Sequence, residues 1–283
     1  MRRPFFFLFL AFALISMACR VAIPVTSIHT GPTETTDIQV PATDGVANLE
    51  FTFGAGILSV KPGLEDGLVG GKATYNVTEL KPEVKINGND ITIQQGNLDT
   101  KGIPNIQGDL KNDWELLLGD APMKLSIRAG AYEGRYEFGG LSLQKLTIAD
   151  GAANVRLSFS EPNRSVMSLL RYETGASDVQ LEGLANANFE EMEFRGGAGS
   201  YTLDFSGELQ RDSQVTIESG ISSVTIIVPE GVNAEVTFDG GLSNVSISGS
   251  WEHLGDQYTQ EGSGPTLKIK IKMGAGDLKL QNP

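Results

Sequence analysis

The chain has 283 residues, of which 40% are hydrophobic, enough to bury a sizeable core. Thirty-four glycines and an aromatic content of 7% favour a turn-rich β protein over a helical one. The formal net charge is −13, from 22 basic and 35 acidic residues. This charge argues against nucleic acid as a partner, and against adhesion to anionic lipid through a basic patch, because both need clustered Lys and Arg.

The first 18 residues have the pattern of a secretory signal peptide. Arg2 and Arg3 supply the charged start, and an uncharged apolar run follows over residues 5–15. That run is too short to span a bilayer unaided, but it has the length of a signal-peptide core. We therefore expect the chain to be exported.

The only cysteine, Cys19, comes directly after this segment. The arrangement resembles the lipobox of bacterial lipoproteins, although Ser16 stands where that pattern has Leu, Val or Ile. We predict a lipoprotein signal peptide over residues 1–18, lipidation of Cys19, and attachment to the membrane through this N-terminal lipid anchor. The alternative is ordinary signal cleavage near Ala18 with a free thiol left behind.

Two segments without the later period follow. Residues 19–45 are rich in Thr, Pro and Gly and predict a flexible tether. Residues 46–120 carry short strand candidates separated by Gly, Asn, Asp and Pro clusters. We interpret them as an N-terminal capping region of antiparallel character, because the ends of a stacked β fold expose unpaired strand edges.

A repeat organises the rest of the chain, residues 121–283. Between Gly130 and Gly241 a strand-like run ends in a glycine at steps of 21, 24, 22, 23 and 21 residues. Apolar residues lie five and three places before each glycine, so one face of each strand points inward. This pattern predicts an all-β fold, a β-solenoid (parallel β-helix-like) of about 22-residue repeats. The polar insert 250–265 is expected to be a surface loop.

Glycine is expected at each corner of the solenoid, where it supplies a positive φ or a close backbone approach. The same run of strand-like residues ending in a glycine occurs once before the regular repeats and once after them. The eight corner glycines are Gly54, Gly130, Gly151, Gly175, Gly197, Gly220, Gly241 and Gly274.

A family resemblance rests on the C-terminal part of the chain. The segment 228–280, with Val-Pro-Glu-Gly-Val at 228–232 and Lys-Met-Gly-Ala-Gly-Asp-Leu at 272–278, resembles the extracytoplasmic toast-rack domain of LiaF-type cell-envelope regulators. Segments 54–93 and 114–162 resemble the N-terminal toast-rack region. The resemblance implies a β-solenoid that faces outward from a bacterial membrane, and it brings no catalytic residues. LiaF-like regulators also carry several transmembrane helices, whereas this chain shows only a signal.

Candidate catalytic residues are few. His29 lies in the expected tether, and His253 lies in the polar insert near Glu252 and Asp256. A histidine beside carboxylates could act as a ligand or base, but both histidines are better explained as solvated loop residues. Cys19 is consumed by processing, so no Cys–His nucleophilic pair exists. We predict no catalytic residues, no cofactor and no enzymatic activity.

Metal binding finds equally little support. Residues 196–200, Gly-Gly-Ala-Gly-Ser, resemble the start of a nonapeptide calcium repeat, but Tyr201 stands in place of its aspartate. Asp178, Asp239 and Asp277 lie near corners, at offsets that we expect to differ, so that they would not stack into a ladder. Calcium needs six to eight oxygen ligands, so we predict no metal site.

Four tyrosines near the corners leave two interpretations open. Exposed aromatic side chains in a row would form a strip for binding a glycan or protein, whereas buried ones would be rung ends that pack on each other. We favour the packing interpretation for Tyr132, Tyr136, Tyr172 and Tyr201.

The sequence as a whole favours a non-enzymatic, lipid-anchored cell-envelope protein. Its rigid β-solenoid would serve scaffolding, sensing or protein interaction outside a bacterial membrane, with an envelope protein or glycan as partner and no nucleic acid. The alternative is an adhesin-like or glycan-binding surface module. A polysaccharide hydrolase is a third hypothesis, but no pair of carboxylates can be placed on adjacent rungs of one face.

Overall fold

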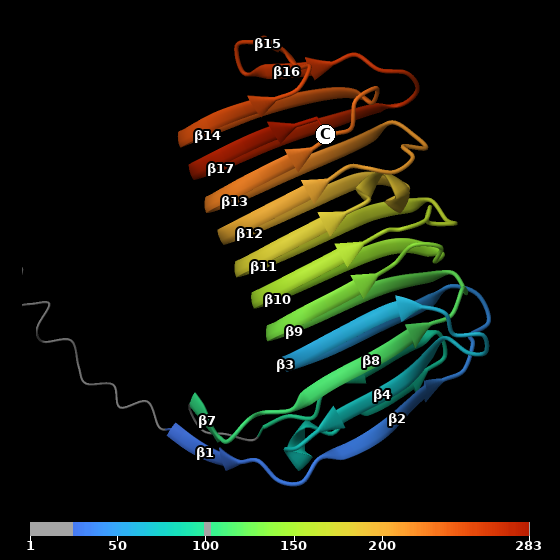
Figure 1. Ribbon diagram of the computed structural model, residues 1–283. Coiled ribbons are helices and arrows are strands. Elements are labelled where there is room, and N and C mark those ends of the chain that lie inside the picture. The colour runs from blue at the N-terminus through green and yellow to red at the C-terminus, as the bar shows by residue number, and fades with distance from the viewer. Residues whose placement is uncertain (1–24, 99–102, 283) are drawn as a thin grey trace, which may run out of the picture.

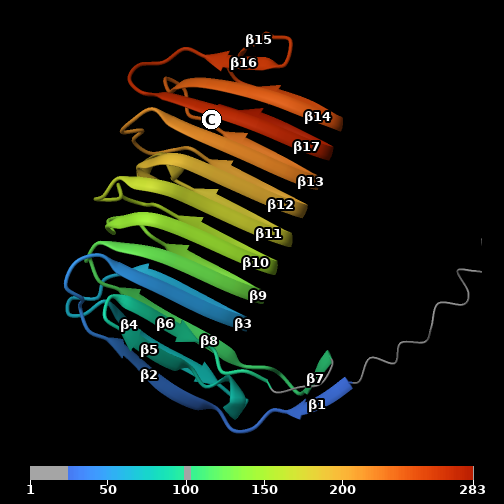
Figure 2. The same cartoon turned by 180° about the vertical axis from the view of Figure 1, so that it is seen from behind.

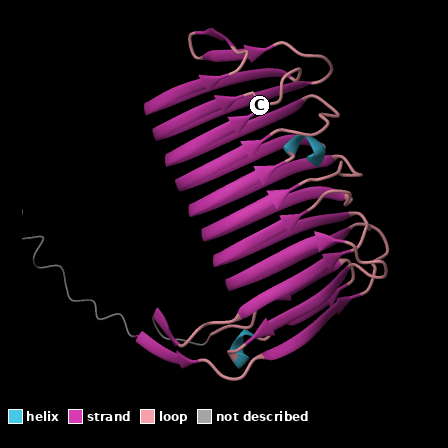
Figure 3. Ribbon diagram, viewed as in Figure 1, coloured by secondary structure: helices cyan, strands magenta, loops and turns pink. Residues whose placement is uncertain are grey.

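The computed structural model describes residues 25–98 and 103–282 of the chain. These residues form strands almost throughout (Figure 3). Helix is limited within them to two short 3-10 segments, η1 (Thr78–Leu80) and η2 (Leu184–Ala187). The predicted all-β fold is confirmed. The signal peptide and Cys19 lie outside the described residues.

The body of the molecule is a stack of long parallel strands (Figure 1). Each strand has 15 or 16 residues and contains one of the eight predicted glycines near its middle. We call each such strand a rung, the part before the glycine its first arm, and the part after the glycine its second arm. In stacking order the rungs are β3 (Ala47–Pro62), β9 (Met123–Glu137), β10 (Leu143–Ser158), β11 (Met167–Glu182), β12 (Phe189–Asp204), β13 (Ser213–Ile227), β17 (Thr266–Gln281) and β14 (Asn233–Ser248).

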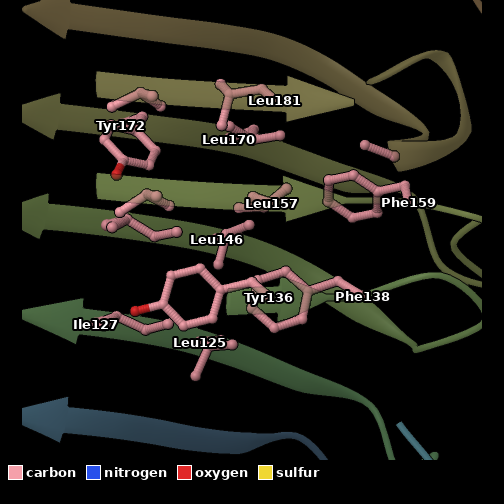
Figure 4. Close-up of a cluster of buried hydrophobic side chains, with 14 of the residues drawn as sticks. Leu125, Ile127, Tyr136, Phe138, Leu146, Leu157, Phe159, Leu170, Tyr172 and Leu181 are labelled. Carbon is pink, nitrogen blue, oxygen red and sulfur yellow. The ribbon is translucent and has the colours of Figure 1, made fainter. Parts of the chain in front are cut away.

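The hydrophobic core fills the space between the two arms. Leu125 and Ile127 of the first arm of β9 point inward, as does Tyr136 of its second arm, and Figure 4 shows these layers repeating from rung to rung. Contacts cross between the arms: the rings of Phe194 and Tyr201, both in β12, meet edge to face with centroids 5.0 Å apart. Each inward Leu, Ile or Phe stabilises the fold by about 1.5–3 kcal/mol when it is buried. Since the neighbouring rungs do the burying, no rung is stable without the stack.

The corner glycines stack directly on one another, and we call them the corner ladder. A Cβ atom on Gly220 would lie 2.5 Å from the carbonyl oxygen of Gly197, and one on Gly274 would lie 2.8 Å from that of Gly220. None of the eight has a left-handed φ. Of the two reasons expected for glycine at the corners, the close approach of neighbouring backbones is therefore the one that applies.

At the N-terminal end, separate strands replace the continuous rung (Figure 2). One pair continues the first arm of β3, and a second group continues its second arm, with β8 parallel to β3 and the next two strands antiparallel. The first pair is β6 (Asp90–Gln94) and β5 (Glu83–Asn87); the second group is β8 (Asn112–Leu118), β4 (Val69–Tyr75) and β2 (Glu34–Val40). A separate two-stranded sheet joins β1 (Val25–His29) to β7 (Ile103–Gln107).

Two predicted boundaries are corrected here. The tether expected over 19–45 contains β2, which pairs with β4 and buries Ile38 and Val40, because apolar residues alternate along it. The capping region expected over 46–120 begins too early, because residues 47–62 form the first complete rung and stack on β9 in register.

The order of the rungs departs from the order of the chain at the C-terminal end. The last strand, β17, inserts between β13 and β14. The insert expected as a surface loop instead forms a hairpin of β15 (Glu252–Leu254) and β16 (Gln257–Gln260), which pairs with the first arm of β14. The hairpin forms because Tyr258 and Gln260 alternate with less buried residues and are themselves buried against the stack.

Candidate functional site

The corner tyrosines belong to the core. Tyr172 and Tyr201 are completely buried, and Tyr132 and Tyr136 nearly so. Tyr172 stacks on Phe194 with ring centroids 5.6 Å apart, and the Tyr136 hydroxyl donates to that of Tyr132 over 3.1 Å. Burial raises the pKa of Tyr136 well above its ordinary value. The packing interpretation is confirmed, and the large hydrophobic side chains exposed in the described part of the chain are all aliphatic.

A polar cluster adjoins these tyrosines near the corner ladder. The Asp150 carboxylate accepts hydrogen bonds from the Tyr172 hydroxyl over 2.7 Å, from the Tyr132 hydroxyl over 3.4 Å, and from the Thr174 hydroxyl. Burial first, and the nearby Asp150 charge second, raise the pKa of Tyr172. This cluster was not predicted from the sequence; its signal was an aspartate directly before Gly151, where neighbouring rungs have small or hydroxyl side chains. The hydrogen bonds fix the carboxylate in a structural role.

The loop side of the stack holds a second buried polar group, Asn163. Its Nδ2 donates to the carbonyl oxygens of Leu143 and Ser165, each over 2.7 Å. Its Oδ1 accepts from the Leu143 N–H over 2.8 Å. The side chain thus substitutes for backbone pairing where the loop leaves β10 without a neighbour, and it ties two successive rungs together.

A shallow groove of about 710 Å³ runs beside the corner ladder. It is lined by four acids and two cations: Asp150, Glu173, Glu218, Asp239, Arg195 and Lys272. Arg195 lies 3.3 Å from Glu173 on one neighbouring rung and 3.7 Å from Glu218 on the other. The charges therefore alternate in sign from Glu173 to Arg195 to Glu218, as in-register stacking favours.

The same alternation continues further along the first arms. Nε and Nη2 of Arg171 donate to the two carboxylate oxygens of Glu193 over 2.9 and 3.1 Å. Hydrogen bonding by Arg171 lowers the pKa of Glu193. Glycoside hydrolysis needs two carboxylates whose environments separate their pKa values, one to act as acid. Glu173, Glu193 and Glu218 on this face are instead paired with arginines, which does not favour the hydrolase hypothesis.

A second hollow of about 700 Å³ lies on the outer face of the second arms, near the N-terminal end. Lys61, Lys72, Arg135 and Arg156 line it together with Glu115 and Glu137. Arg135 pairs with Glu133 and Arg156 with Glu182, each over 2.7 Å. This is a local concentration of basic side chains on an acidic protein, with two of the four held by carboxylates outside the hollow.

The two histidines lie far from any such cluster. His29 is exposed at the end of β1. His253 is exposed in β15, where its ring stacks on Tyr258 with centroids 4.6 Å apart and its Nε2 lies 2.5 Å from the Gly255 carbonyl oxygen.

The three aspartates considered as calcium ligands were expected at different positions of the repeat, and this is wrong for two of them. Asp178 and Asp277 share a register position, three residues after their corner glycines, but β12 and β13 separate them with Ser200 and Ser223 in between. Asp239 lies on the other arm. Over the described ranges, the structure brings together no group of three or more His, Cys, Asp or Glu side chains that could hold a metal ion.

Comparison with known families decides the classification. Residues 29–169 and 162–227 match the family described as the N-terminal domain of toast_rack, DUF2154. The chain belongs to the toast-rack family. The match ends where the resemblance to LiaF-type regulators begins, at Val228, so that finer resemblance stays a prediction. Curated proteins provide no match.

One solved structure has a fold like that of this chain, and others match it more loosely. A protein of Clostridium sporogenes, described as a "putative cell adhesion protein", is 17% identical, with a TM-score of 0.50, over 89% of this chain and 100% of its own. A "putative adhesin" of Bacteroides fragilis is 12% identical, with a TM-score of 0.39, over 90% of this chain and 100% of its own. At 17% identity, the first likeness shows the fold alone. Within residues 25–98 and 103–282, no helix is long and apolar enough to cross a membrane.

Proposed function

We propose that this toast-rack protein is a non-enzymatic component of the bacterial cell envelope. A lipid on Cys19 holds it to the membrane, and its β-solenoid stands outside the membrane as a rigid scaffold for contacts with other proteins. The signal-like segment 1–18 and the position of Cys19 directly after it support the anchor.

One observation carries the proposal: the polar and aromatic groups best suited to chemistry serve the stack itself. Asp150 accepts hydrogen bonds from tyrosine and threonine hydroxyls at the core edge, the corner tyrosines are buried, and Arg195 bridges acids on adjacent rungs. A long, in-register stack with such internal bonding resists bending and presents fixed surfaces, which suits recognition of a partner.

Cell fractionation tests the anchor and the placement. The full-length protein should partition with membranes after a salt wash, and surface-added protease should degrade it in cells whose outer layers have been opened. The variant Cys19→Ala should move to the soluble fraction, whereas Ser16→Ala should stay with membranes. A Cys19→Ala protein that remains with washed membranes would exclude the lipid anchor.

Adhesion is the second candidate, favoured by the description of the Clostridium sporogenes protein, which has the same fold, as a cell adhesion protein. Purified chain lacking residues 1–19, immobilised on beads, would then bind whole cells. Treating the cells with periodate, which oxidises glycans, separates glycan binding from protein binding. Loss of binding after periodate would favour the glycan-binding alternative, and loss after protease treatment would favour a protein partner.

A further inference from the structure

The C-terminal end of the stack is covered over only half of its width. β16 pairs with residues 234–237 in the first arm of β14, and the Phe238 N–H donates to the Asp256 carbonyl oxygen over 3.0 Å. Residues 242–248, in the second arm, pair with β17 alone. No strand among the described residues lies on the other side of this arm, which we call the free edge.

The free edge presents unpaired backbone groups. The Ser248 carbonyl oxygen accepts from the Asn282 N–H, on the β17 side, over 3.1 Å. Successive residues of a strand direct their backbone groups to opposite sides. Ser243, Val245 and Ile247 therefore point their N–H and C=O groups away from β17. An added strand would form its backbone hydrogen bonds with these three alternate residues.

The core is also open here. Val245 and Ile247 hold the inward register positions, yet Val245 is only half-buried and Ile247 is 43% exposed. The residues at the same positions in the two rungs beneath are completely buried: Val224, Ile226, Leu278 and Leu280. A further strand would bury Val245 and Ile247 as the stack buries their counterparts.

Apolar and unpartnered side chains gather at the same end. Directly after the corner glycine, rungs nearer the N-terminal end have alanine, but Leu242 in β14 is 85% exposed and Ile221 in β13 is 73% exposed. The Ser243 hydroxyl and the Trp251 indole N–H are buried without a hydrogen-bond partner. These are the signs of an interface that is incomplete in the isolated chain.

The free edge lacks the usual protection of an edge strand. Residues 240–250 contain no charged side chain and no proline, in a chain of net charge −13. At the opposite end of the stack, the edge strand β2 carries Glu34 and Asp37. Natural proteins place charges or proline on edges that must not pair, so the difference between the two ends favours pairing at β14.

The hairpin strand β16 obstructs two-fold pairing of a second copy of the chain at the free edge. If two β14 strands paired about a two-fold axis, both first arms would lie on the same face of the joined sheet. The first arm of the second copy would then need the level beside β14 that β16 already occupies. A single extended segment meets no such obstacle.

From these observations we propose that the free edge of β14 binds an extended segment of a partner protein as a further strand. The segment has apolar side chains at alternate positions, which cover Val245 and Ile247. This inference rests on the proposed function, protein contact outside the membrane, and assigns that contact to one place in the fold.

The test uses a labelled peptide with the sequence of residues 274–282, Gly-Ala-Gly-Asp-Leu-Lys-Leu-Gln-Asn. In the protein this sequence pairs with the other edge of β14, so it copies a next rung. Fluorescence anisotropy with the full-length protein in detergent should show saturable binding. A peptide of the same composition in scrambled order should not bind.

Two variants and one control show where on the protein the peptide binds. Ser243→Pro removes one N–H at the free edge and leaves the bonds to β17, and it should weaken binding at least tenfold. Ile247→Lys sets a charge in the inward row and should weaken it as much. Leu254→Lys introduces the same charge at a more exposed apolar residue on the hairpin; it is the control and should leave affinity unchanged. Circular dichroism confirms that each variant folds.

Absence of saturable binding, or equal binding by all variants, overturns the inference. Sedimentation that shows the native chain self-associating, with loss in Ser243→Pro and Ile247→Lys, would assign the edge to a second copy and overturn it too. If the peptide fails but cross-linking in envelopes identifies a partner on another face, the inference falls and the proposed function stands. If the peptide binds but envelopes yield no protein partner, the proposed function falls.

Discussion

The corner ladder predicts a graded response to the smallest possible substitution, glycine to alanine. A Cβ on Gly220 would lie 2.5 Å from the Gly197 carbonyl oxygen, about 0.9 Å inside the 3.4 Å at which ordinary van der Waals contact begins. Neighbouring strands lie about 4.8 Å apart and are held by hydrogen bonds along both arms, so they cannot separate locally without losing those bonds. Overpacking of this kind costs about 1–3 kcal/mol.

The reference substitution is Gly31→Ala. Its Cβ would lie 3.7 Å from the nearest atom, the Asn76 carbonyl oxygen, and its φ is not in the left-handed region. It should leave stability unchanged or raise it by about 0.5 kcal/mol, because alanine restricts the unfolded chain. Gly220→Ala should therefore be about 2 kcal/mol less stable than Gly31→Ala. With a urea dependence of about 2 kcal/mol per M, the midpoint falls by about 1 M.

Two more positions complete the series. The nearest oxygen would lie 2.8 Å from a Cβ on Gly274 and 3.2 Å from one on Gly151. Urea midpoints from the β signal in circular dichroism should fall in the order Gly31→Ala, Gly151→Ala, Gly274→Ala and Gly220→Ala. Equal midpoints across the series would refute the claim that close backbone approach, and nothing else, demands glycine at the corners.

Further predictions concern the polar groups inside and around the stack. Asn163→Leu leaves the Leu143 N–H and C=O without partners and should cost about 2–4 kcal/mol, measured as a lower urea midpoint; an unchanged midpoint would mean that water replaces the amide. Burial acts to raise the pKa of Glu137, but hydrogen bonds from Ser158, Ser160 and the Gly139 N–H together lower it below its ordinary 4.5. Its contribution to stability is thus complete above pH 4.5 and is lost as the pH falls below that value, so the native midpoint should fall more steeply with acid than that of Glu137→Gln. If the urea midpoints of the native protein and of Glu137→Gln fall equally with pH, Glu137 does not cause the loss of stability in acid. The partly buried pair of Arg171 and Glu193 should contribute about 0.5–1 kcal/mol to stability, measured by a double-mutant cycle at low salt. A coupling energy of zero would mean that the pair does not stabilise the fold.

Much of the fold could be predicted because stacking leaves a regular record in the sequence. Apolar residues five and three places before each glycine, as at Leu125 and Ile127, define inward positions by simple alternation, and the structure buries both. The glycines mark the corners because a side chain cannot fit between rungs. Both signals are local, so a single sequence carries them.

The order of the rungs is a different matter, since it depends on pairing between distant segments. Nothing in the residues of β17 distinguishes a strand stacked on β14 from one inserted between β13 and β14. The predicted tether is wrong for a related reason: Ile38 and Val40 form too short an alternation to signal a strand without its partner β4. Long-range pairing decides both cases.

The candidate surfaces divide in the same way. Burial of the corner tyrosines followed from their place in the repeat, but the Asp150 cluster required knowledge of which rungs are neighbours. The free edge could not be predicted from the sequence either, because Val245 and Ile247 show the same inward alternation as any other rung. Only the three-dimensional order reveals that no further rung of the described chain covers them.

Contact with another protein outside the membrane is the core of the proposed function. Its most direct test is cross-linking of the full-length protein in living cells, followed by purification from solubilised envelopes and mass spectrometry of the cross-linked peptides. We expect a defined protein partner in near-stoichiometric amount, cross-linked to residues of the solenoid, and loss of that partner in the Cys19→Ala variant. Recovery of the chain alone, or joined only to glycan, would contradict it.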